Sequence, residues 1–213
     1  MKTDDLIDML SSGPDAGRPT RTPRAALLPL LGGLLASVAV MLMLLGVRSN
    51  LLEELTWAAF WSKLLFSLAL AAAGWLAVKR LSAPGAATGQ LTLYLGAPIL
   101  LAWCGAAVLL ANAAPELRAE LFWGRTWRYC PLLIALISLP IFAAVLHIMR
   151  NRAPTRLRLA GGAAGFAAGA SAAAVYCLHC PELSIAFVGF WYLLGILIPT
   201  ALGALIGPRV LAW

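Results

Sequence analysis

The chain has 213 residues, of which 62% are hydrophobic and 12% charged, and its formal net charge is +7. Soluble domains of this size are about 45–50% apolar and about 25% charged, so the composition excludes an ordinary water-soluble fold and predicts an integral membrane protein. The basic residues lie at the ends of apolar segments and form no interleaved aromatic-basic surface, which argues against direct nucleic-acid binding.

A polar segment, residues 1–24, precedes the first apolar stretch and begins MKTDDLIDMLSSG. A threonine is suited to cap a short helix here, two aspartates occupy its positively polarised first turn, and three aliphatic residues share one stripe. These residues are Thr3, Asp4, Asp5, Leu6, Ile7 and Leu10. Two interpretations stay open: a frayed terminus, or an acidic amphipathic peptide that folds into a groove on a soluble partner.

Six apolar runs follow, each long enough for a helix to cross the hydrocarbon core of a bilayer. Backbone in lipid must satisfy its own hydrogen bonds, and no run shows the alternation of a barrel strand, so we expect an all-α polytopic protein. One transmembrane domain, residues 25–213, would hold all six spans and leave no room for a second globular domain. The predicted spans are about 26–47, 57–78, 91–113, 129–149, 159–177 and 184–206.

The basic residues predict the orientation of the chain. With six spans both termini share one side, which carries eleven basic residues against four on the other side. The positive-inside rule therefore puts both termini in the cytoplasm. The eleven are Lys2, Arg18, Arg21, Arg24, Lys79, Arg80, Arg150, Arg152, Arg156, Arg158 and Arg209, and the four are Arg48, Arg118, Arg125 and Arg128.

The spans themselves contain few reactive groups. Gly161, Gly165 and Gly169 recur at every fourth position of the fifth span and predict close helix packing. Lys63, two turns into the second span, is expected to reach outward or to pair with Glu53 or Glu54. Cys104, in the middle of the third span, is expected to be a small core residue. The spans lack acidic or histidine side chains near mid-depth, which weakens a transport function.

The other three cysteines fall on the outer side, around the sequence YCLHCPEL at 176–183. Cys130 begins the fourth span, and Cys177, His179 and Cys180 lie in the connection between the fifth and sixth spans. One explanation is a disulfide, Cys130–Cys180 or Cys177–Cys180. A second is a soft-metal site, for which these four residues supply thiolates and an imidazole suited to copper or zinc. The third is coincidence, since a single C-x-x-C motif is a weak signal.

The opening MKTDDLIDML, the six spans, the cysteine before the fourth span, the HCPE segment (179–182) and the ending GALIGPRVLAW (203–213) together resemble the NrsF family. Members of this family are bacterial inner-membrane anti-sigma factors that hold an extracytoplasmic-function sigma factor inactive. The resemblance implies that the cytoplasmic N-terminal segment contributes to sigma-factor binding. It also implies that a periplasmic cysteine pair, matched here by Cys130 and Cys180, senses heavy metals such as chromate, cadmium or copper, or an associated thiol stress.

On this basis we expect a regulator with no catalytic residues and no obligatory cofactor. Two competing functions remain: a membrane thiol oxidoreductase passing electrons from Cys177 and Cys180 to a quinone, and a small metal transporter. The oxidoreductase would need a second outer cysteine pair for a dithiol relay, and the sequence lacks one.

Overall fold

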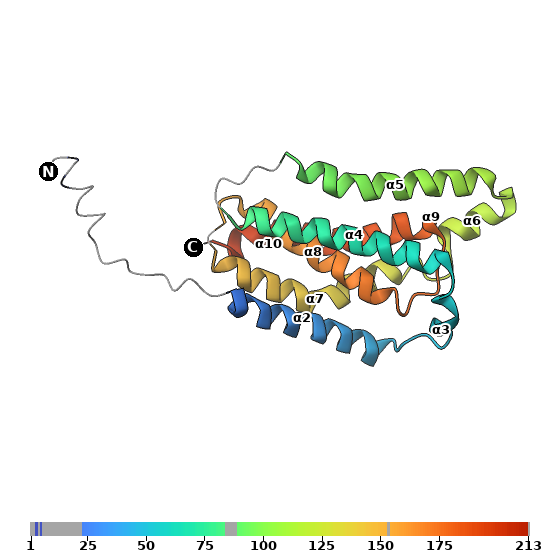
Figure 1. Ribbon diagram of the computed structural model, residues 1–213, viewed down its shortest axis with the longest axis horizontal. Coiled ribbons are helices and arrows are strands. Elements are labelled where there is room, and N and C mark those ends of the chain that lie inside the picture. Colours follow the sequence, from blue (N-terminus) through green and yellow to red (C-terminus); the bar gives the residue numbers. More distant parts are fainter. Residues whose placement is uncertain (1–2, 4, 6–22, 84–88, 153, 213) are drawn as a thin grey trace.

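The computed structural model describes residues 3, 5, 23–83, 89–152 and 154–212, and every regular element in those ranges is helical. The elements are α2 (Pro23–Leu44), α3 (Leu51–Glu54), α4 (Ala58–Leu81), α5 (Leu91–Asn112), α6 (Pro115–Trp123), α7 (Cys130–Arg150), α8 (Leu157–Tyr176), α9 (Ile185–Phe187), the π-helix η1 (Val188–Tyr192) and α10 (Leu193–Val210). The long helices run up and down in a bundle (Figure 1).

Six of these helical segments are long and apolar enough to cross a membrane, which confirms the all-helical prediction. The second and last extend beyond the expected ends, to Leu81 and Val210. Hydropathy falls at Lys79, Arg80 and Arg209, but the helices continue through these residues. A basic residue need not end a helix here, because its long side chain can reach a polar layer from within the helix. Helix α9, the π-helix η1 and α10 together form the last segment, Ile185–Val210.

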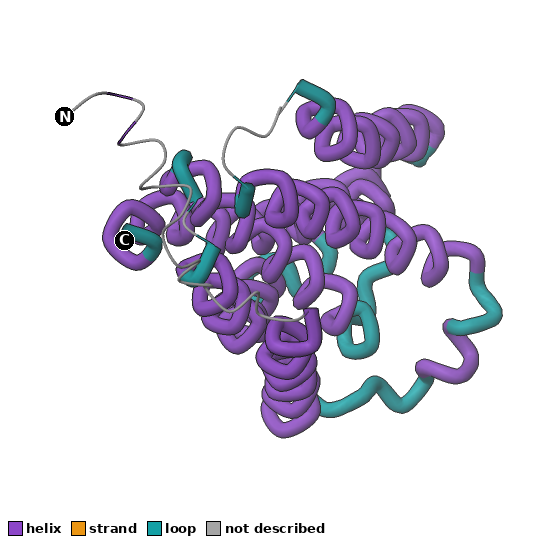
Figure 2. Tube along the Cα trace, turned by 60° about the vertical axis from the view of Figure 1, so that its left-hand side comes forward, coloured by secondary structure: helices purple, strands orange, loops and turns teal. Residues whose placement is uncertain are grey.

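Helix α8 lies at the centre of the bundle and packs against α10, α4 and α7 (Figures 1 and 2). Its glycines allow this arrangement, because they bring its backbone against the backbone of α10. A Cβ atom on Gly161 would overlap the carbonyl group of Gly203, and one on Gly165 would overlap that of Pro199. A Cβ on Gly169 would lie 3.0 Å from the Cα of Ile196.

Helix α5 lies at the edge of the bundle, and its sides are largely exposed (Figures 1 and 2). Cys104 is exposed on this helix. The expectation that Cys104 is a core residue is therefore wrong, because an apolar span with few neighbours presents most of its surface outward whatever its hydropathy.

The helices alternate in direction, so residues far apart in the sequence gather at the two ends of the bundle. One end, which we term the cysteine end, contains the starts of α4 and α7 and the connection between α8 and α9. The opposite end, termed the basic end, contains the last turns of α4, α7 and α10, with Lys79, Arg80, Arg150 and Arg209. Helix α2 also begins at the basic end, directly after the N-terminal segment (Figure 1).

Candidate functional site

Cys130 and Cys180 meet at the cysteine end, although fifty residues separate them in sequence. Cys130 begins α7, and Pro131 follows it in the first turn, where a missing N–H leaves no hydrogen bond unmade. Cys180 lies in the connection after α8. Both side chains are completely buried and belong to one cluster of buried residues, together with Tyr176 at the end of α8.

The two cysteines of the C-x-x-C motif have different acidities. The hydrogen bond from Cys130 lowers the pKa of Cys180 to about 6, and the Lys63 ammonium lowers it further, although burial acts in the opposite direction. Burial raises the pKa of Cys177 to about 11, because the hydroxyl of Ser67 and the Lys63 charge only partly offset the loss of solvation. Cys180 is therefore the thiol that ionises more readily.

Cys177 and His179 point to other partners. The sulfur of Cys177 lies 3.7 Å from the Ser67 hydroxyl oxygen. The Nδ1 atom of His179 lies 3.1 Å from the carbonyl oxygen of Gly46, in the connection after α2. Across the described residues, no three His, Cys, Asp or Glu side chains are grouped to hold a metal ion, and all four cysteines are free thiols. The arrangement is thus a two-sulfur site formed by Cys130 and Cys180.

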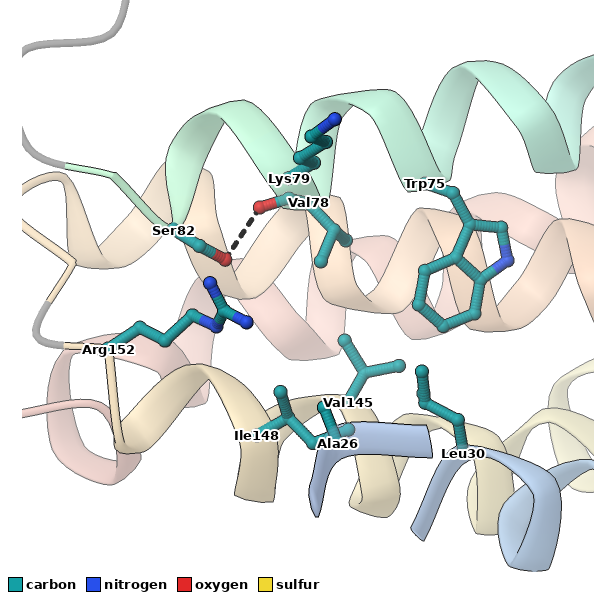
Figure 3. A pocket seen from close by; sticks show the side chains of 9 residues that line it. All are labelled: Ala26, Leu30, Trp75, Val78, Lys79, Ser82, Val145, Ile148 and Arg152. Carbon is teal, nitrogen blue, oxygen red and sulfur yellow. Dashed lines mark hydrogen bonds between the residues drawn. The ribbon is translucent and has the colours of Figure 1, made fainter. Parts of the chain in front are cut away.

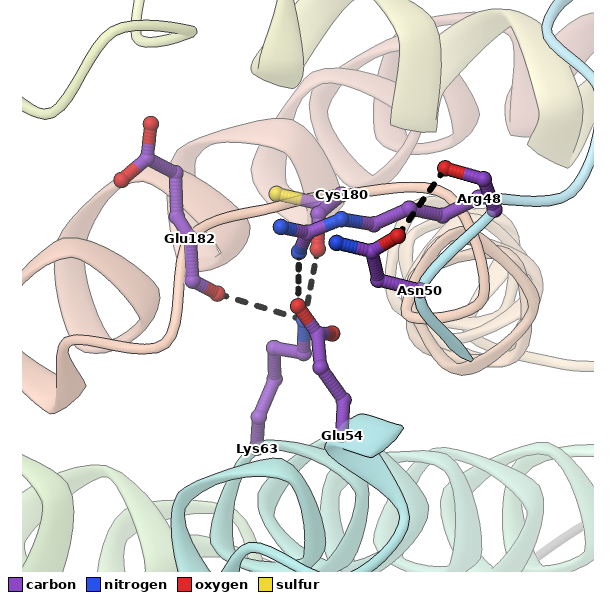
Figure 4. Close-up of polar contacts among 7 residues, drawn as sticks. Arg48, Asn50, Glu54, Lys63, Cys180 and Glu182 are labelled. Atoms are coloured by element: carbon purple, nitrogen blue, oxygen red, sulfur yellow. Dashed lines mark hydrogen bonds and ion pairs between the residues drawn. The ribbon is translucent and has the colours of Figure 1, made fainter. Parts of the chain in front are cut away.

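Lys63 holds the backbone that carries Cys180 (Figure 4). Its ammonium donates hydrogen bonds to the carbonyl oxygen of Cys180 at 2.8 Å and to that of Glu182 at 3.2 Å. The Lys63 side chain is only 2% exposed. The expectation that Lys63 reaches outward or pairs with a neighbouring glutamate is wrong, because Glu54 instead forms an ion pair with Arg48.

Glu182 ties the same connection to the segment before α7. Its carboxylate accepts hydrogen bonds from the backbone N–H of Arg125 at 2.7 Å and from the hydroxyl of Thr126 at 3.5 Å. Gly124 makes room for this carboxylate, because a Cβ atom there would lie 2.7 Å from the carboxyl carbon of Glu182. Gly124 also has a φ of +55°, a conformation that favours glycine.

Sequence reasoning did not identify Lys63, Glu182 and Gly124 as parts of this site. One signal was present, since an ionisable residue within an apolar span indicates function by default. The partners of Lys63 are backbone carbonyl groups, however, and every residue has one, so the sequence could not identify them.

The residues predicted to bind the partner lie near the N-terminus. Thr3 and Asp5 are helical and exposed. Asp4, Leu6, Ile7 and Leu10 lie outside the described residues, so the apolar stripe remains a prediction.

The basic end has a hollow of about 280 Å³ between α2, α4 and α7 (Figure 3). Lys79 and Arg152 supply positive charge at its edge, and Trp75 and Leu30 form part of its apolar wall. The hydroxyl of Ser82 is satisfied within α4, donating to the carbonyl oxygen of Val78 at 2.7 Å.

These features define a class: a small helical bundle with membrane-length apolar helices, a buried thiol pair at one end and a cluster of basic residues at the other. The family described as "Negative regulator of sigma F" (NrsF) matches residues 10–213, and the chain belongs to this family. The family resemblance expected from the sequence is thereby confirmed.

Two relatives align over their whole length. A protein of Azospira oryzae named "Probable anti-sigma-F factor NrsF" is 51% identical over 213 residues, covering 100% of both chains. A protein of Caulobacter vibrioides named "Anti-sigma-F factor NrsF" is 38% identical over 218 residues, again covering 100% of both. No solved structure matches this chain.

Proposed function

We propose that this protein is an inner-membrane anti-sigma factor that holds a cytoplasmic sigma factor of the extracytoplasmic-function class away from RNA polymerase. The observation that carries the proposal is the end-to-end similarity to two proteins named as anti-sigma-F factors, one of them 51% identical. Six membrane-length helices support a multi-pass arrangement in the lipid bilayer. By the positive-inside rule the basic end would face the cytoplasm and the cysteine end the periplasm.

The N-terminal segment is the proposed contact for the sigma factor. Leu6, Ile7 and Leu10 would enter an apolar groove on the partner, while Asp4 and Asp5 meet basic residues at its rim. An isolated helix of about ten residues is marginal in water, so binding would stabilise this helix. Because the segment leads directly into α2, the bound sigma factor would stay beside the membrane.

The Cys130–Cys180 pair is the proposed input. An oxidant would convert the two thiols into a disulfide, taking up two electrons while two protons leave. A soft metal ion such as copper or cadmium would instead bind both sulfurs as thiolates, releasing their protons. The burial of both cysteines in one cluster supports either outcome, because each needs the two sulfur atoms close together. Cys177 and His179 would respond only indirectly.

The input must supply enough free energy to change the occupancy of the sigma-factor site. Moving a partner from about 99% bound to 1% bound needs a difference of about 5.5 kcal/mol between the two states. A single disulfide typically supplies about 2–4 kcal/mol, and a metal–thiolate site can supply more. The input would act on a bundle in which α8 touches α4, α7 and α10, so a change at α7 reaches neighbouring helices through direct contact.

The first test measures transcription from a promoter that depends on the partner sigma factor, in cells given copper, cadmium or chromate. Cells carrying Cys130→Ser with Cys180→Ser should lose the response or be fixed in one state. Cys104→Ser is the matched control, because Cys104 is exposed in the middle of α5, and it should respond like the parent. A parental response in the double variant would rule out the pair as the input.

The second test measures sigma-factor binding directly, by co-purification from solubilised membranes. Leu6→Asp with Ile7→Asp should abolish capture of the sigma factor by placing charge on the apolar stripe. Ser12→Asp adds a similar charge on the opposite side of the predicted helix and should leave capture unchanged. Equal capture by all the variants would exclude the stripe as the contact.

A further inference from the structure

Lys63 is a cation enclosed within the bundle, and no carboxylate forms an ion pair with it among the described residues. Its partners are two backbone carbonyl oxygens and the ring of Phe60, whose centroid lies 5.6 Å from the ammonium nitrogen. An ammonium withdrawn from water is costly unless something compensates it, and ionisable residues inside apolar spans are therefore rarely incidental. The acceptors of Lys63 belong to the segment that carries Cys180.

The hydrogen bond to Cys180 acts on the residue that bears the sulfur. The carbonyl group of Cys180 is held from the side of α4 at 2.8 Å, while its backbone N–H donates to the carbonyl oxygen of Tyr176 at 3.0 Å. Pro181 follows, with a restricted φ and no N–H. The carbonyl of Glu182 then returns to Lys63. Lys63 thus fixes the backbone on both sides of Pro181.

The opposite wall of the site is anchored independently of Lys63. The N–H of Cys130 donates to the carbonyl oxygen of Thr126 at 2.9 Å, a contact in which Lys63 takes no part. The Glu182 carboxylate is a second tether of the Cys180 connection, because it accepts from the N–H of Arg125 at 2.7 Å. Cys130 is therefore held by its own helix start, whereas Cys180 lies in a connection without regular structure. The separation of the two sulfurs depends on what restrains that connection.

We propose that Lys63 is the positioning residue of this pair: its two hydrogen bonds hold the Cys180 backbone so that the sulfur lies against Cys130. The inference rests on the proposed function only in assigning the pair a role, since the positioning itself can be measured in the isolated protein. It also assigns α4 a part in the response. Any reaction that draws Cys180 toward α7 changes the contacts of Lys63, and α4 extends from there to the basic end.

The test is disulfide formation in the purified full-length protein, in detergent, with diamide as oxidant. Two thiols lose two protons and two electrons, the S–S bond forms, and the diazene is reduced to the hydrazine. In the parent, Cys130–Cys180 should be the main product by peptide mass spectrometry. K63M keeps the length of the side chain and removes its donors, and it should form this product about tenfold more slowly, the factor expected from losing charge-assisted hydrogen bonds.

The controls separate positioning from general damage. K79M makes the same change in the same helix, at the exposed basic end, and should cross-link at the parental rate. K63R restores cationic donors and should recover most of the lost rate, which a purely steric role would not produce. If K63M does not accumulate, the comparison between K63Q and K63R decides, and K63R should again be the faster.

Two outcomes would overturn the inference: parental cross-linking in K63M that keeps its helical content, or no rescue by K63R over K63Q. Failure of the parent to join Cys130 and Cys180 would also overturn it. A cross-link that depends on Lys63 in a protein that binds no sigma factor would refute the proposed function and support the positioning role. The two proposals therefore fail separately.

Discussion

Replacing Gly165 by alanine adds one methyl group at the contact between α8 and α10. That methyl would overlap the carbonyl group of Pro199, which is backbone and cannot rotate away. Gly162 provides a matched control on the same helix. It is also buried, but a Cβ there meets its nearest neighbour, the Cβ of Ala204, at 3.6 Å, an ordinary van der Waals contact.

Substitution by alanine should change the free energy of unfolding in opposite directions at the two positions. Alanine is favoured over glycine inside a helix by about 0.5–1 kcal/mol, so Gly162→Ala should be neutral or stabilising. Gly165→Ala has the same gain but also an overlap, and overpacking typically costs about 1–3 kcal/mol. We therefore expect Gly165→Ala to lower the free energy of unfolding by about 1–2 kcal/mol. Helix α10 would have to move outward to accept the methyl group.

The assay is unfolding in mixed micelles with a rising fraction of dodecyl sulfate, followed by the fluorescence of the eight tryptophans. This signal reports on tertiary packing, which is the property that the substitution perturbs. If Gly165→Ala were as stable as Gly162→Ala, the close backbone contact between α8 and α10 at Gly165 would be refuted.

Three other results should follow from the structure. Cys180 should titrate near pH 6 in a thiolate absorbance titration, and Cys130→Ala should raise its pKa, so an unshifted titration in the variant would contradict the assignment. Because the pKa of Cys180 is lower in the folded protein than in the unfolded chain, its contribution to stability is complete above the unfolded pKa. That contribution declines as the pH falls through about 6. Gly124→Ala should lower the melting temperature through its positive φ of +55°, at a cost of about 1–3 kcal/mol, and an unchanged melting temperature would count against it. Glu54→Ala should lower the free energy of unfolding by about 1–3 kcal/mol, less than for a fully buried pair because its partner Arg48 is 28% exposed. Glu53→Ala, at the exposed neighbouring position, should change it by less than about 0.5 kcal/mol. Equal effects of the two substitutions in denaturant unfolding would exclude the ion pair as the cause.

The sequence predicted the helices and the gathering of Cys130 with Cys180 at one end of the bundle. The helices follow from length and hydropathy, because a run of about 20 apolar residues in lipid has few other ways to satisfy its backbone. The shared end of the two cysteines follows from counting spans, since each crossing reverses the direction of the chain. Neither argument depends on how the helices pack.

The errors concern which face of a helix meets a neighbour. Cys104 was expected in the core and is exposed, because hydropathy cannot distinguish a helix face that contacts protein from one that faces lipid. Lys63 was expected to seek a carboxylate and instead contacts the carbonyl oxygens of Cys180 and Glu182. His179, two positions from Cys177 in the sequence, turns to Gly46, because the connection after α8 is not a continuing helix.

The π-helix η1 divides the last span into two parts with different tasks. Trp191 and Tyr192 are buried at the cysteine end, whereas Gly203 and Gly207 further along lie against α8. A π-turn holds one residue more than an α-turn, and each α-helical residue turns the chain by about 100°. If residues 188–192 instead formed a regular α-helix, the extra residue would rotate the following part by about that angle relative to the preceding part, so that only one of the two contacts could survive. The π-helix thus sets the rotation of the last span so that Trp191 and Tyr192 are buried at the cysteine end while Gly203 and Gly207 pack against α8.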